Sequence, residues 1–277
     1  NQAFPMMAFA AAKGRDLDLP KTLVKEQAEH VATFIASNRE KFRKGEGTGG
    51  QVDTAGYAML ALELAEHPAD ENTAAVVEYF LKTQPDRDHW RTVSHRPPSE
   101  ASDFTPTYQA MRAIRKWGTK EQAERGAKRI DSARGWLLKA TPKDTEDRVF
   151  RLLGLKEGGA EASAIAAAAD ELLRTQRSNG GWSQLPDMEP DAYATATALV
   201  ALHRAGGLAV NAPAFSRGTA FLVRTQRTDG SWHIASRSKP FQPYYESGFP
   251  HGKDQFIAAA ASGWATTALI LSEGSKR

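Results

Sequence analysis

The segment LLRTQRSNGGW, residues 172–182, recurs as LVRTQRTDGSW at residues 222–232 and as FLKTQPDRDHW at residues 80–90. Each copy contains two apolar residues, a cation, a Thr and a Gln, and a Trp follows six positions after the Gln. The pairs are Gln84 and Trp90, Gln176 and Trp182, and Gln226 and Trp232. A fourth copy from Trp136 has lost both the Gln and the loop Trp. Repetition of this kind indicates internal duplication and a fold of stacked units.

Two kinds of helix are expected to alternate around these segments. The helices before each Gln carry charge on one face, which is typical of an outer layer facing solvent. They are expected at residues 22–44, 73–83, 120–139, 161–175 and 213–225. The helices that follow are mostly apolar or small nearly all round, so they are expected to be buried. They are expected at residues 4–13, 54–65, 107–117, 148–156, 192–205 and 255–271.

This alternation favours a ring of helical hairpins. No repeat can bury its inner helix alone, so neighbours must stack, and closing the ring leaves no exposed end. The sequence therefore predicts an all-α fold, a closed α/α toroid forming a single domain over residues 1–277. An open solenoid is the alternative, but it needs atypical end repeats. Six inner and five outer helices are expected, which indicates about six hairpins with the first outer helix upstream of Asn1.

Composition excludes several classes of protein. The net charge is +3 and the cations are spread among acidic neighbours, so no nucleic-acid-binding surface is expected. No stretch approaches the roughly 18 apolar residues of a membrane span. The chain has 0 cysteines, which excludes disulfides and thiolate metal sites within it. The first residues already have the pattern of an apolar helix without a basic leader, so a preceding segment is expected.

The Gln and Trp segments resemble the QW repeats of squalene cyclases, oxidosqualene cyclases and prenyltransferase β-subunits, over nearly the whole chain. In that family the Gln caps a helix end and the Trp packs over it. The resemblance therefore implies a scaffolding role for the six Gln and Trp residues quoted above. A large buried indole with one N–H that needs a partner suits that role.

Two further stretches, DAYAT at residues 191–195 and PYYESGFPHGKDQ at residues 243–255, resemble an exported bacterial group of squalene-cyclase-like repeat proteins. In that group a Cys-x-x-Cys-His-His segment often precedes a start such as Asn1–Gln2. The resemblance implies export to the periplasm and a c-type haem on a segment upstream of Asn1, with no cofactor in the chain itself. It also implies that a haem segment or another protein docks at the rim of the ring.

The catalytic motifs of the family are not found. Terpene cyclases that protonate their substrate use an Asp-rich DxDD motif, and complete cyclases of this kind have two barrels. The nearest match is MEPDAYATATAL, where Asp191 opens an inner helix. Prenyltransferases use zinc with a Cys ligand, which this chain lacks. His233, Glu246, His251 and Asp254 lie in one long loop region, but their spacing fits no standard zinc site, and solvated loop histidines are the simpler interpretation.

Acidic residues recur where inner helices begin, at Asp53, Asp103, Asp147, Asp191 and Asp254. The simpler interpretation is N-capping, because an Asp at a helix start accepts hydrogen bonds from free backbone N–H groups. The starts also converge on one rim, so a carboxylate there is a candidate acid. Asp191 and Asp254 are the best candidates because Tyr193 and Phe256 lie beside them.

Aromatic residues on the inner helices are candidate ligand contacts: Tyr57, Tyr108, Phe150, Tyr193, Phe256 and Trp264. Such rings can line an isoprenoid pocket and stabilise cations, or they can simply fill the core. The loops at residues 95–106 and 233–253 are long enough to fold over the rim as a lid or a docking surface.

Two functional hypotheses follow. The favoured one is a non-catalytic module of an exported protein that supports a haem segment or docks a partner, because the tested catalytic motifs are missing. It predicts a packed barrel. The alternative is an apolar-ligand-binding protein or a cyclase-type enzyme with a rim acid, which predicts an open cavity lined by the inner aromatics.

Overall fold

A computed structural model describes residues 3–13, 15, 17, 21–239 and 243–273 of the chain. Asn1 and Gln2, next to which the haem segment is expected, lie outside the described residues. The helices are α1 (Ala3–Ala12), α2 (Lys21–Ser37), α3 (Arg39–Lys44), α4 (Gln51–Leu64), α5 (Glu71–Lys82), α6 (Phe104–Trp117), α7 (Ala123–Lys139), α8 (Thr145–Glu157), α9 (Ala162–Leu173), α10 (Ala192–Arg204), α11 (Pro213–Thr225) and α12 (Gln255–Ser272). Two short 3-10 turns, η1 (Lys120–Gln122) and η2 (Gly252–Asp254), precede α7 and α12.

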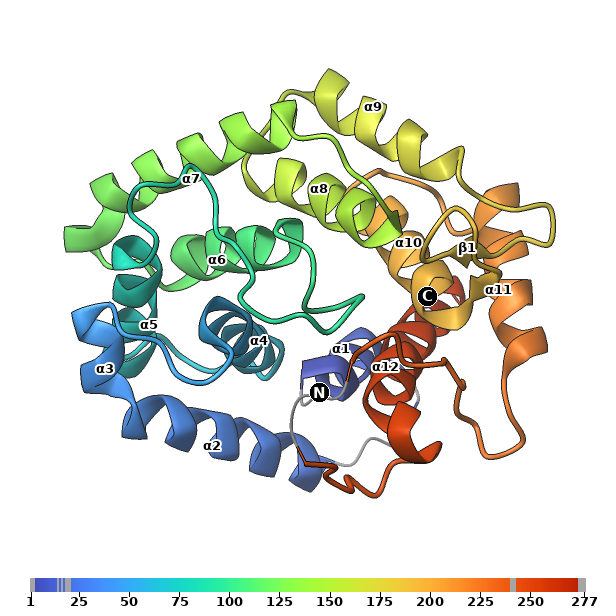
Figure 1. Cartoon of the computed structure of the whole chain (residues 1–277), viewed down its shortest axis with the longest axis horizontal. Helices are drawn as coiled ribbons and strands as arrows, with labels where there is room; N and C mark the ends of the chain where they lie inside the picture. The colour runs from blue at the N-terminus through green and yellow to red at the C-terminus, as the bar shows by residue number, and fades with distance from the viewer. Residues whose placement is uncertain (1–2, 14, 16, 18–20, 240–242, 274–277) are drawn as a thin grey trace.

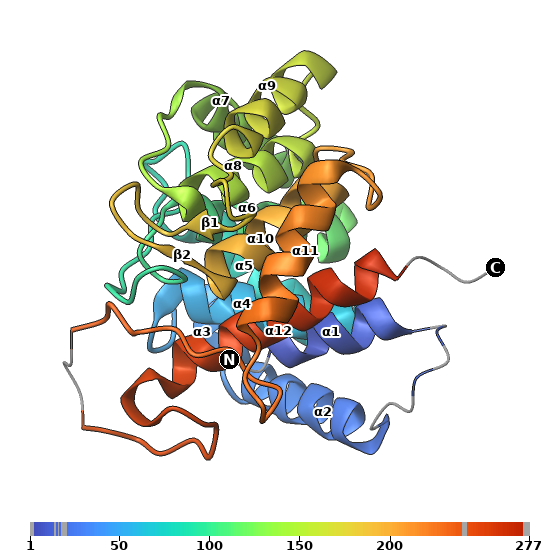
Figure 2. The ribbon, with the colours of Figure 1, turned by 90° about the vertical axis from the view of Figure 1, so that its right-hand side faces the viewer.

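The helices form a closed ring in two layers (Figure 1). The inner layer runs α1, α4, α6, α8, α10 and α12, each packed against the next, and α1 packs against α12 to complete the circle. The outer layer consists of α2 with α3, then α5, α7, α9 and α11. The predicted all-α toroid is therefore confirmed. Figure 2 shows the same ring from the side, with α1 and α12 lying together.

The closing contact depends on a glycine. A Cβ built on Gly263 of α12 would come within 2.7 Å of the backbone carbon and oxygen of Phe4 on α1. Any side chain at this position would push the two helices apart. The first and last inner helices thus meet backbone to backbone.

The three Trp segments make the same hydrogen bonds in each hairpin. The indole Nε1 of Trp90, Trp182 and Trp232 donates to a carbonyl of the preceding outer helix, at 3.0, 3.0 and 2.9 Å. The acceptors are Phe80 O, Leu172 O and Leu222 O. Each Trp backbone N–H donates to a hydroxyl of the following inner helix, on Thr107, Thr195 or Ser262. One residue therefore joins an outer helix end, through its indole, to the next inner helix, through its backbone N–H.

The Gln side chains close the loops between those helices. Nε2 of Gln176 and of Gln226 donates to the oxygen of Gly180 and Gly230 respectively, both at 2.9 Å. Gln84 bonds instead to the Arg91 backbone, accepting at 2.7 Å and donating at 3.0 Å. The Gln thus holds the loop, while the Trp caps the helix end.

Three local features differ from expectation. The first outer helix, expected over residues 22–44, breaks at Asn38, whose side chain donates to Phe34 O at 2.8 Å. The loop after Trp182 forms a two-stranded hairpin of β1 (Trp182–Ser183) and β2 (Pro190–Asp191). Residues 252–272 are also long and apolar enough for a membrane span, contrary to expectation, but α12 packs between α1 and α10. Burial in the ring explains its composition.

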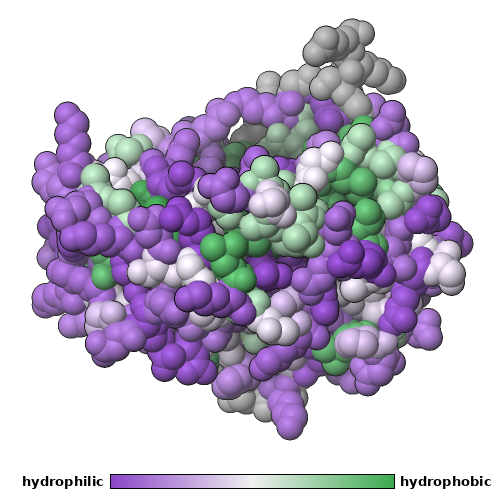
Figure 3. Space-filling model, turned by 90° about the horizontal axis from the view of Figure 1, so that it is seen from above, coloured by the Kyte–Doolittle hydropathy of each residue, from purple (hydrophilic) through white to green (hydrophobic). Residues whose placement is uncertain are grey.

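Seen from above, over α7 and α9, the surface is mainly hydrophilic, with hydrophobic residues in small separate groups (Figure 3). The outer helices thus shield the inner ones from solvent, and the chemistry must be sought inside the ring and at its two mouths.

Candidate functional site

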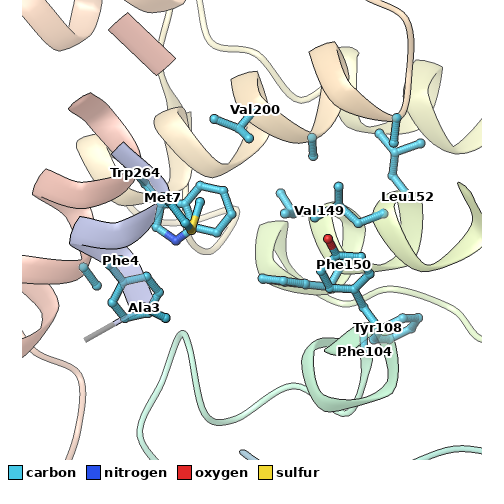
Figure 4. Packing of buried hydrophobic residues seen from close by; sticks show 14 of the residues in the cluster. Ala3, Phe4, Met7, Phe104, Tyr108, Val149, Phe150, Leu152, Val200 and Trp264 are labelled. Atoms are coloured by element: carbon cyan, nitrogen blue, oxygen red, sulfur yellow. The ribbon is translucent and has the colours of Figure 1, made fainter. Parts of the chain in front are cut away.

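The interior of the ring is nearly filled. The cavity between the inner helices holds about 20 Å³, roughly enough for one water molecule. Its walls include Met7, Tyr57, Tyr108, Gln109, Phe150 and Trp264. Figure 4 shows Met7 and Trp264 on one side, with Phe150 and Tyr108 on the other. The Phe150 and Trp264 rings meet edge to face, with centroids 6.5 Å apart.

Most of the aromatic residues lie where the sequence places them. Tyr57, Tyr108 and Trp264 line the cavity, and Tyr193 lies at the mouth formed by the starts of the inner helices, which we call the front mouth. Phe256 is an exception: it is 40% exposed, so it does not face the interior. Phe256 is not among the residues that line the cavity, whereas Trp264 on the same helix is.

Glu146 joins the front mouth to this interior. It lies one helical turn before Phe150 and two turns before Leu153 on α8, so the three side chains share one face of the helix. Phe150 and Leu153 both line the cavity. The Glu146 carboxyl is therefore directly in front of the aromatic layer.

The surroundings of Glu146 favour the protonated form of its carboxyl. The residue is 3% exposed, and its oxygens accept hydrogen bonds from the Tyr193 hydroxyl and the Thr105 hydroxyl, each at 3.1 Å. Burial, reinforced by the nearby Asp144, raises the pKa of Glu146 well above its ordinary value, and the two hydroxyls only partly oppose this rise. A proton on this carboxyl is therefore held more tightly than on an exposed Glu, and two donors are placed to stabilise the carboxylate if that proton leaves.

Two loops cover this carboxyl. Pro98 from the loop at residues 91–103 and Arg237 from the loop after Trp232 both pack close to Glu146. The free volume left around the carboxyl is about 0 Å³. The Tyr57 hydroxyl fixes the first loop by donating to Ser99 O at 3.1 Å. In Figure 1 this loop extends across the front of the ring. The proton on Glu146 is thus separated from bulk water.

Asp191, one of the two acids expected from the sequence, is an N-cap. It accepts hydrogen bonds from the Ala194 backbone at 2.9 Å and from Gln184 Nε2 at 2.8 Å. Burial raises its pKa, against the effect of these bonds. Because both of its oxygens are engaged in holding α10 and the β hairpin, its role is accounted for by structure.

Asp254, the other expected acid, holds the rim loop. Its oxygens accept from His233 Nε2 and from the Ser236 backbone, both at 2.9 Å. Burial acts to raise the pKa of Asp254, but these hydrogen bonds outweigh it and the pKa lies below its ordinary value. Asp254 is therefore a carboxylate at neutral pH and has no proton to donate.

The capping interpretation of the recurring acids is mostly wrong. Apart from Asp191, the side chains of these acids make no cap bond to their own helix and bind rim loops instead. The loop partners of Asp53, Asp103 and Asp147 are Thr92 Oγ1, Thr92 N and Ser102 Oγ. The true cap of α8 is Asp144, which accepts from the Asp147 backbone at 2.9 Å. The acids at the front mouth thus fasten the covering loops.

The histidines of the long loop do not form a metal centre. His233 pairs with Asp254, and His251 Nε2 lies 2.7 Å from the Ser231 hydroxyl. Within the described residues no group of three or more His, Asp or Glu side chains is arranged to hold a metal ion.

Glu146 was missed in the sequence analysis because the DxDD motif was expected to contain only aspartates at its acidic positions. The segment Asp144-Thr145-Glu146-Asp147 has the spacing of a DxDD motif with one Glu in place of the third residue. The eroded repeat that begins at Trp136 contains this segment. Loss of the Gln and Trp from that copy, together with three acids in four residues, was the available signal.

Comparisons with known proteins agree on the fold. Neither protein-family models nor curated protein sequences match the chain. Among solved structures, ent-copalyl diphosphate synthase from Streptomyces platensis superposes with a TM-score of 0.62 at 17% identity, over 99% of this chain and 50% of that one. The chain thus spans about half the length of that relative. The type II terpene cyclase MstE from Scytonema gives a TM-score of 0.59 at 16% identity, over 98% of this chain and 86% of that one. These likenesses establish a terpene-cyclase-like fold.

Proposed function

We propose that this chain is an acid-catalysing enzyme of the terpene-cyclase type, in which Glu146 protonates a carbon–carbon double bond of an apolar isoprenoid held in the ring. The observation that carries the proposal is the buried, covered Glu146 carboxyl in front of an aromatic-lined interior. The likeness to MstE supports it. The match covers 86% of that type II terpene cyclase, so a cyclase of this type can be little longer than one such ring.

The chemistry balances with the residues present. The Glu146 O–H bond breaks, a C–H bond forms at one alkene carbon, and the other carbon becomes a carbocation. The faces of Tyr57, Phe150 and Trp264 stabilise that charge. Attack by a second double bond of the same substrate forms a ring, and water takes a proton from the final cation, which restores an alkene. A proton from solvent returns to Glu146 when the covering loops open to release the product. The hydroxyls of Tyr193 and Thr105 stabilise the carboxylate of Glu146 meanwhile.

Substrate entry requires movement. The present cavity of about 20 Å³ is much smaller than an isoprenoid. A second pocket of about 220 Å³ opens between α1, α2 and α4, and Tyr57 lines both spaces. We propose that Tyr57 separates this entrance from the interior, so that its rotation, with release of the Ser99 contact, admits the substrate.

The test is proton transfer to a linear polyprene in deuterated water. The wild-type chain is incubated with linear polyprenes of several lengths as hydrocarbons, alcohols and diphosphates, and products are analysed by mass spectrometry. A cyclic product with deuterium on carbon is expected. Glu146→Gln should reduce its formation by about 100-fold or more, whereas Glu124→Gln, on the exposed face of α7, should not. Absence of any deuterated product, or full activity of Glu146→Gln, contradicts the proposal.

A second proposal retains the non-catalytic module, and the small interior volume favours it. In this case the ring is an exported, periplasmic scaffold for a c-type haem segment or a docked partner at the rim. The discriminating measurement is an absorption spectrum of the protein expressed from its complete gene in a host that attaches haem. A Soret band supports it, and its absence together with an upstream sequence lacking paired cysteines contradicts it.

A further inference from the structure

The ring interior contains polar groups without partners. Both amide atoms of Gln109, Nε2 and Oε1, and the indole Nε1 of Trp264 are buried and form no hydrogen bond with any described part of the chain. Gln109 is 3% exposed and Trp264 is 5% exposed. Burying such groups unpaired costs about 1–3 kcal/mol each, so a folded protein normally provides a partner.

These groups face one space. Gln109 on α6 and Trp264 on α12 both line the central cavity, whose volume of about 20 Å³ suits a single oxygen-sized group. Arg112 and Arg204 also border the cavity, and Arg112 pairs with Glu63 and the Tyr108 hydroxyl. The rest of the lining is mainly apolar, with Met7 and Phe150 nearby. The unpaired atoms at this cavity are thus two kinds of donor and one acceptor.

The Gln109 side chain is held in this position by its neighbours. A Cβ on Gly56 of α4 would lie 2.2 Å from Gln109 Oε1, so only a glycine leaves room for the amide. Burial is the main cause that raises the pKa of Tyr57. The Gln109 amide lies close enough to that hydroxyl to oppose the rise, but the pair lacks hydrogen-bond geometry and the hydroxyl donates to Ser99 O instead. Gln109 is therefore fitted into the wall with its polar end unpaired.

We propose that the interior binds an apolar ligand through a hydroxyl oxygen, with Trp264 Nε1 and Gln109 Nε2 donating to it and Gln109 Oε1 accepting its proton. A hydroxyl both accepts and donates, so it can pair with all three atoms, whereas a pure hydrocarbon leaves them unpaired. The apolar body of this ligand rests on the proposed function. The hydroxyl does not, because it follows from the unpaired groups alone.

The experiment compares two ligands that differ only in the hydroxyl. A C15 isoprenoid alcohol and the hydrocarbon of the same skeleton are titrated calorimetrically into the Glu146→Gln protein, which prevents turnover. The alcohol should bind about tenfold more tightly or better, since one buried hydrogen bond is worth about 1.4 kcal/mol. Gln109→Leu and Trp264→Phe should each reduce this preference severalfold. Gln226→Leu, in a repeat loop, should leave it unchanged.

Equal affinities for the two ligands in the protein with intact Gln109 and Trp264 overturn the inference, as water alone would then satisfy these groups. So does failure of both ligands to bind, or a preference that survives both substitutions. The outcome is separable from that of the proposed function. Alcohol-selective binding without any deuterated product contradicts only the catalytic proposal. Turnover without alcohol selectivity contradicts only the proposed recognition of a hydroxyl.

Discussion

The tryptophans of the repeat loops and the tryptophan of the interior have equally buried rings but differently used N–H groups. Trp90, Trp182 and Trp232 each donate to a helix carbonyl at about 3 Å. Trp264, 5% exposed, donates to no described residue. The three loop indoles thus have their hydrogen-bond partners on the adjacent outer helices, which is what a scaffold requires. The interior indole lacks such a partner in the described part of the chain, and this is the basis of the ligand proposal.

The glutamines repeat the contrast. Gln176 donates to Gly180 O and Ala214 O and accepts from Arg217. Gln109 makes no such bond. Identical side chains are therefore fully paired in a repeat loop and unpaired in the interior, and substitution should separate the two.

The largest effect is expected from removing a loop tryptophan. Trp182 is 0% exposed, and its loss leaves both a large cavity and an unpaired Leu172 carbonyl. Trp182→Ala should lower the free energy of unfolding by about 5 kcal/mol, measured by urea denaturation. Val223→Ala, at a position that is 61% exposed, serves as the control. A loss below about 1 kcal/mol would show that the Trp loops do not hold the hairpins together.

The next prediction concerns Asp53, in which one carboxyl oxygen accepts a hydrogen bond and the other has no partner among the described residues. Oδ2 accepts from Thr92 at 2.7 Å, while Oδ1 is buried with no partner in the described chain. Burial raises the pKa of Asp53 from 3.8 to about 7. The folded state thus binds the proton more tightly than the unfolded state, so this stabilisation is complete below pH 4 and is lost as the pH rises through 7.

Asp53→Asn should abolish this pH dependence. Relative to wild type, the variant's free energy of unfolding should increase by about 4 kcal/mol between pH 4 and pH 8. Denaturation curves across that range measure the difference, with the exposed Asp187→Asn as a matched control. Parallel curves for wild type and Asp53→Asn would mean that the carboxyl is ionised in the folded protein at all these pH values.

A matched pair of glutamine substitutions should have opposite signs. Gln176→Leu breaks three hydrogen bonds and should lower the free energy of unfolding by about 2 kcal/mol. Gln109→Leu removes two unpaired polar atoms from an apolar wall and should raise it by about 1 kcal/mol. Thermal and urea unfolding of the ligand-free proteins provide the comparison. If both substitutions destabilise equally, Gln109 has an internal partner and the contrast fails.

The sequence was sufficient to predict the ring because its information is repeated. Three copies of one hydrogen-bonding device and the alternation of helix types predict hairpins, and six apolar helices cannot be buried without closing. The break at Asn38 and the β hairpin after Trp182 were not predictable, because each depends on single side-chain bonds.

The site was predicted less well, because its parts are brought together from different helices. The sequence predicted that Tyr57, Tyr108 and Trp264 lie on the interior side of their helices, since inward-facing aromatic residues follow the helical period. Glu146 was passed over because its pKa depends on burial by loops far away in sequence, including Pro98 and Arg237. Gln109 carried no signal at all, because a lack of partners can be seen only in three dimensions.

The last comparison, with a smaller expected difference than the glutamine pair, most directly tests the contrast between the loop and interior tryptophans. Phe retains most of the indole's apolar area and removes only the N–H, so the cost of Trp→Phe reports chiefly on that hydrogen bond. Trp182→Phe leaves the Leu172 carbonyl unpaired and should cost about 2 kcal/mol more than Trp264→Phe, since the Trp264 N–H has no partner to lose. Urea denaturation of both variants without ligand measures the difference. Equal losses in the free energy of unfolding would place Trp264 among the scaffold tryptophans, and would contradict the proposal of a ligand in the interior.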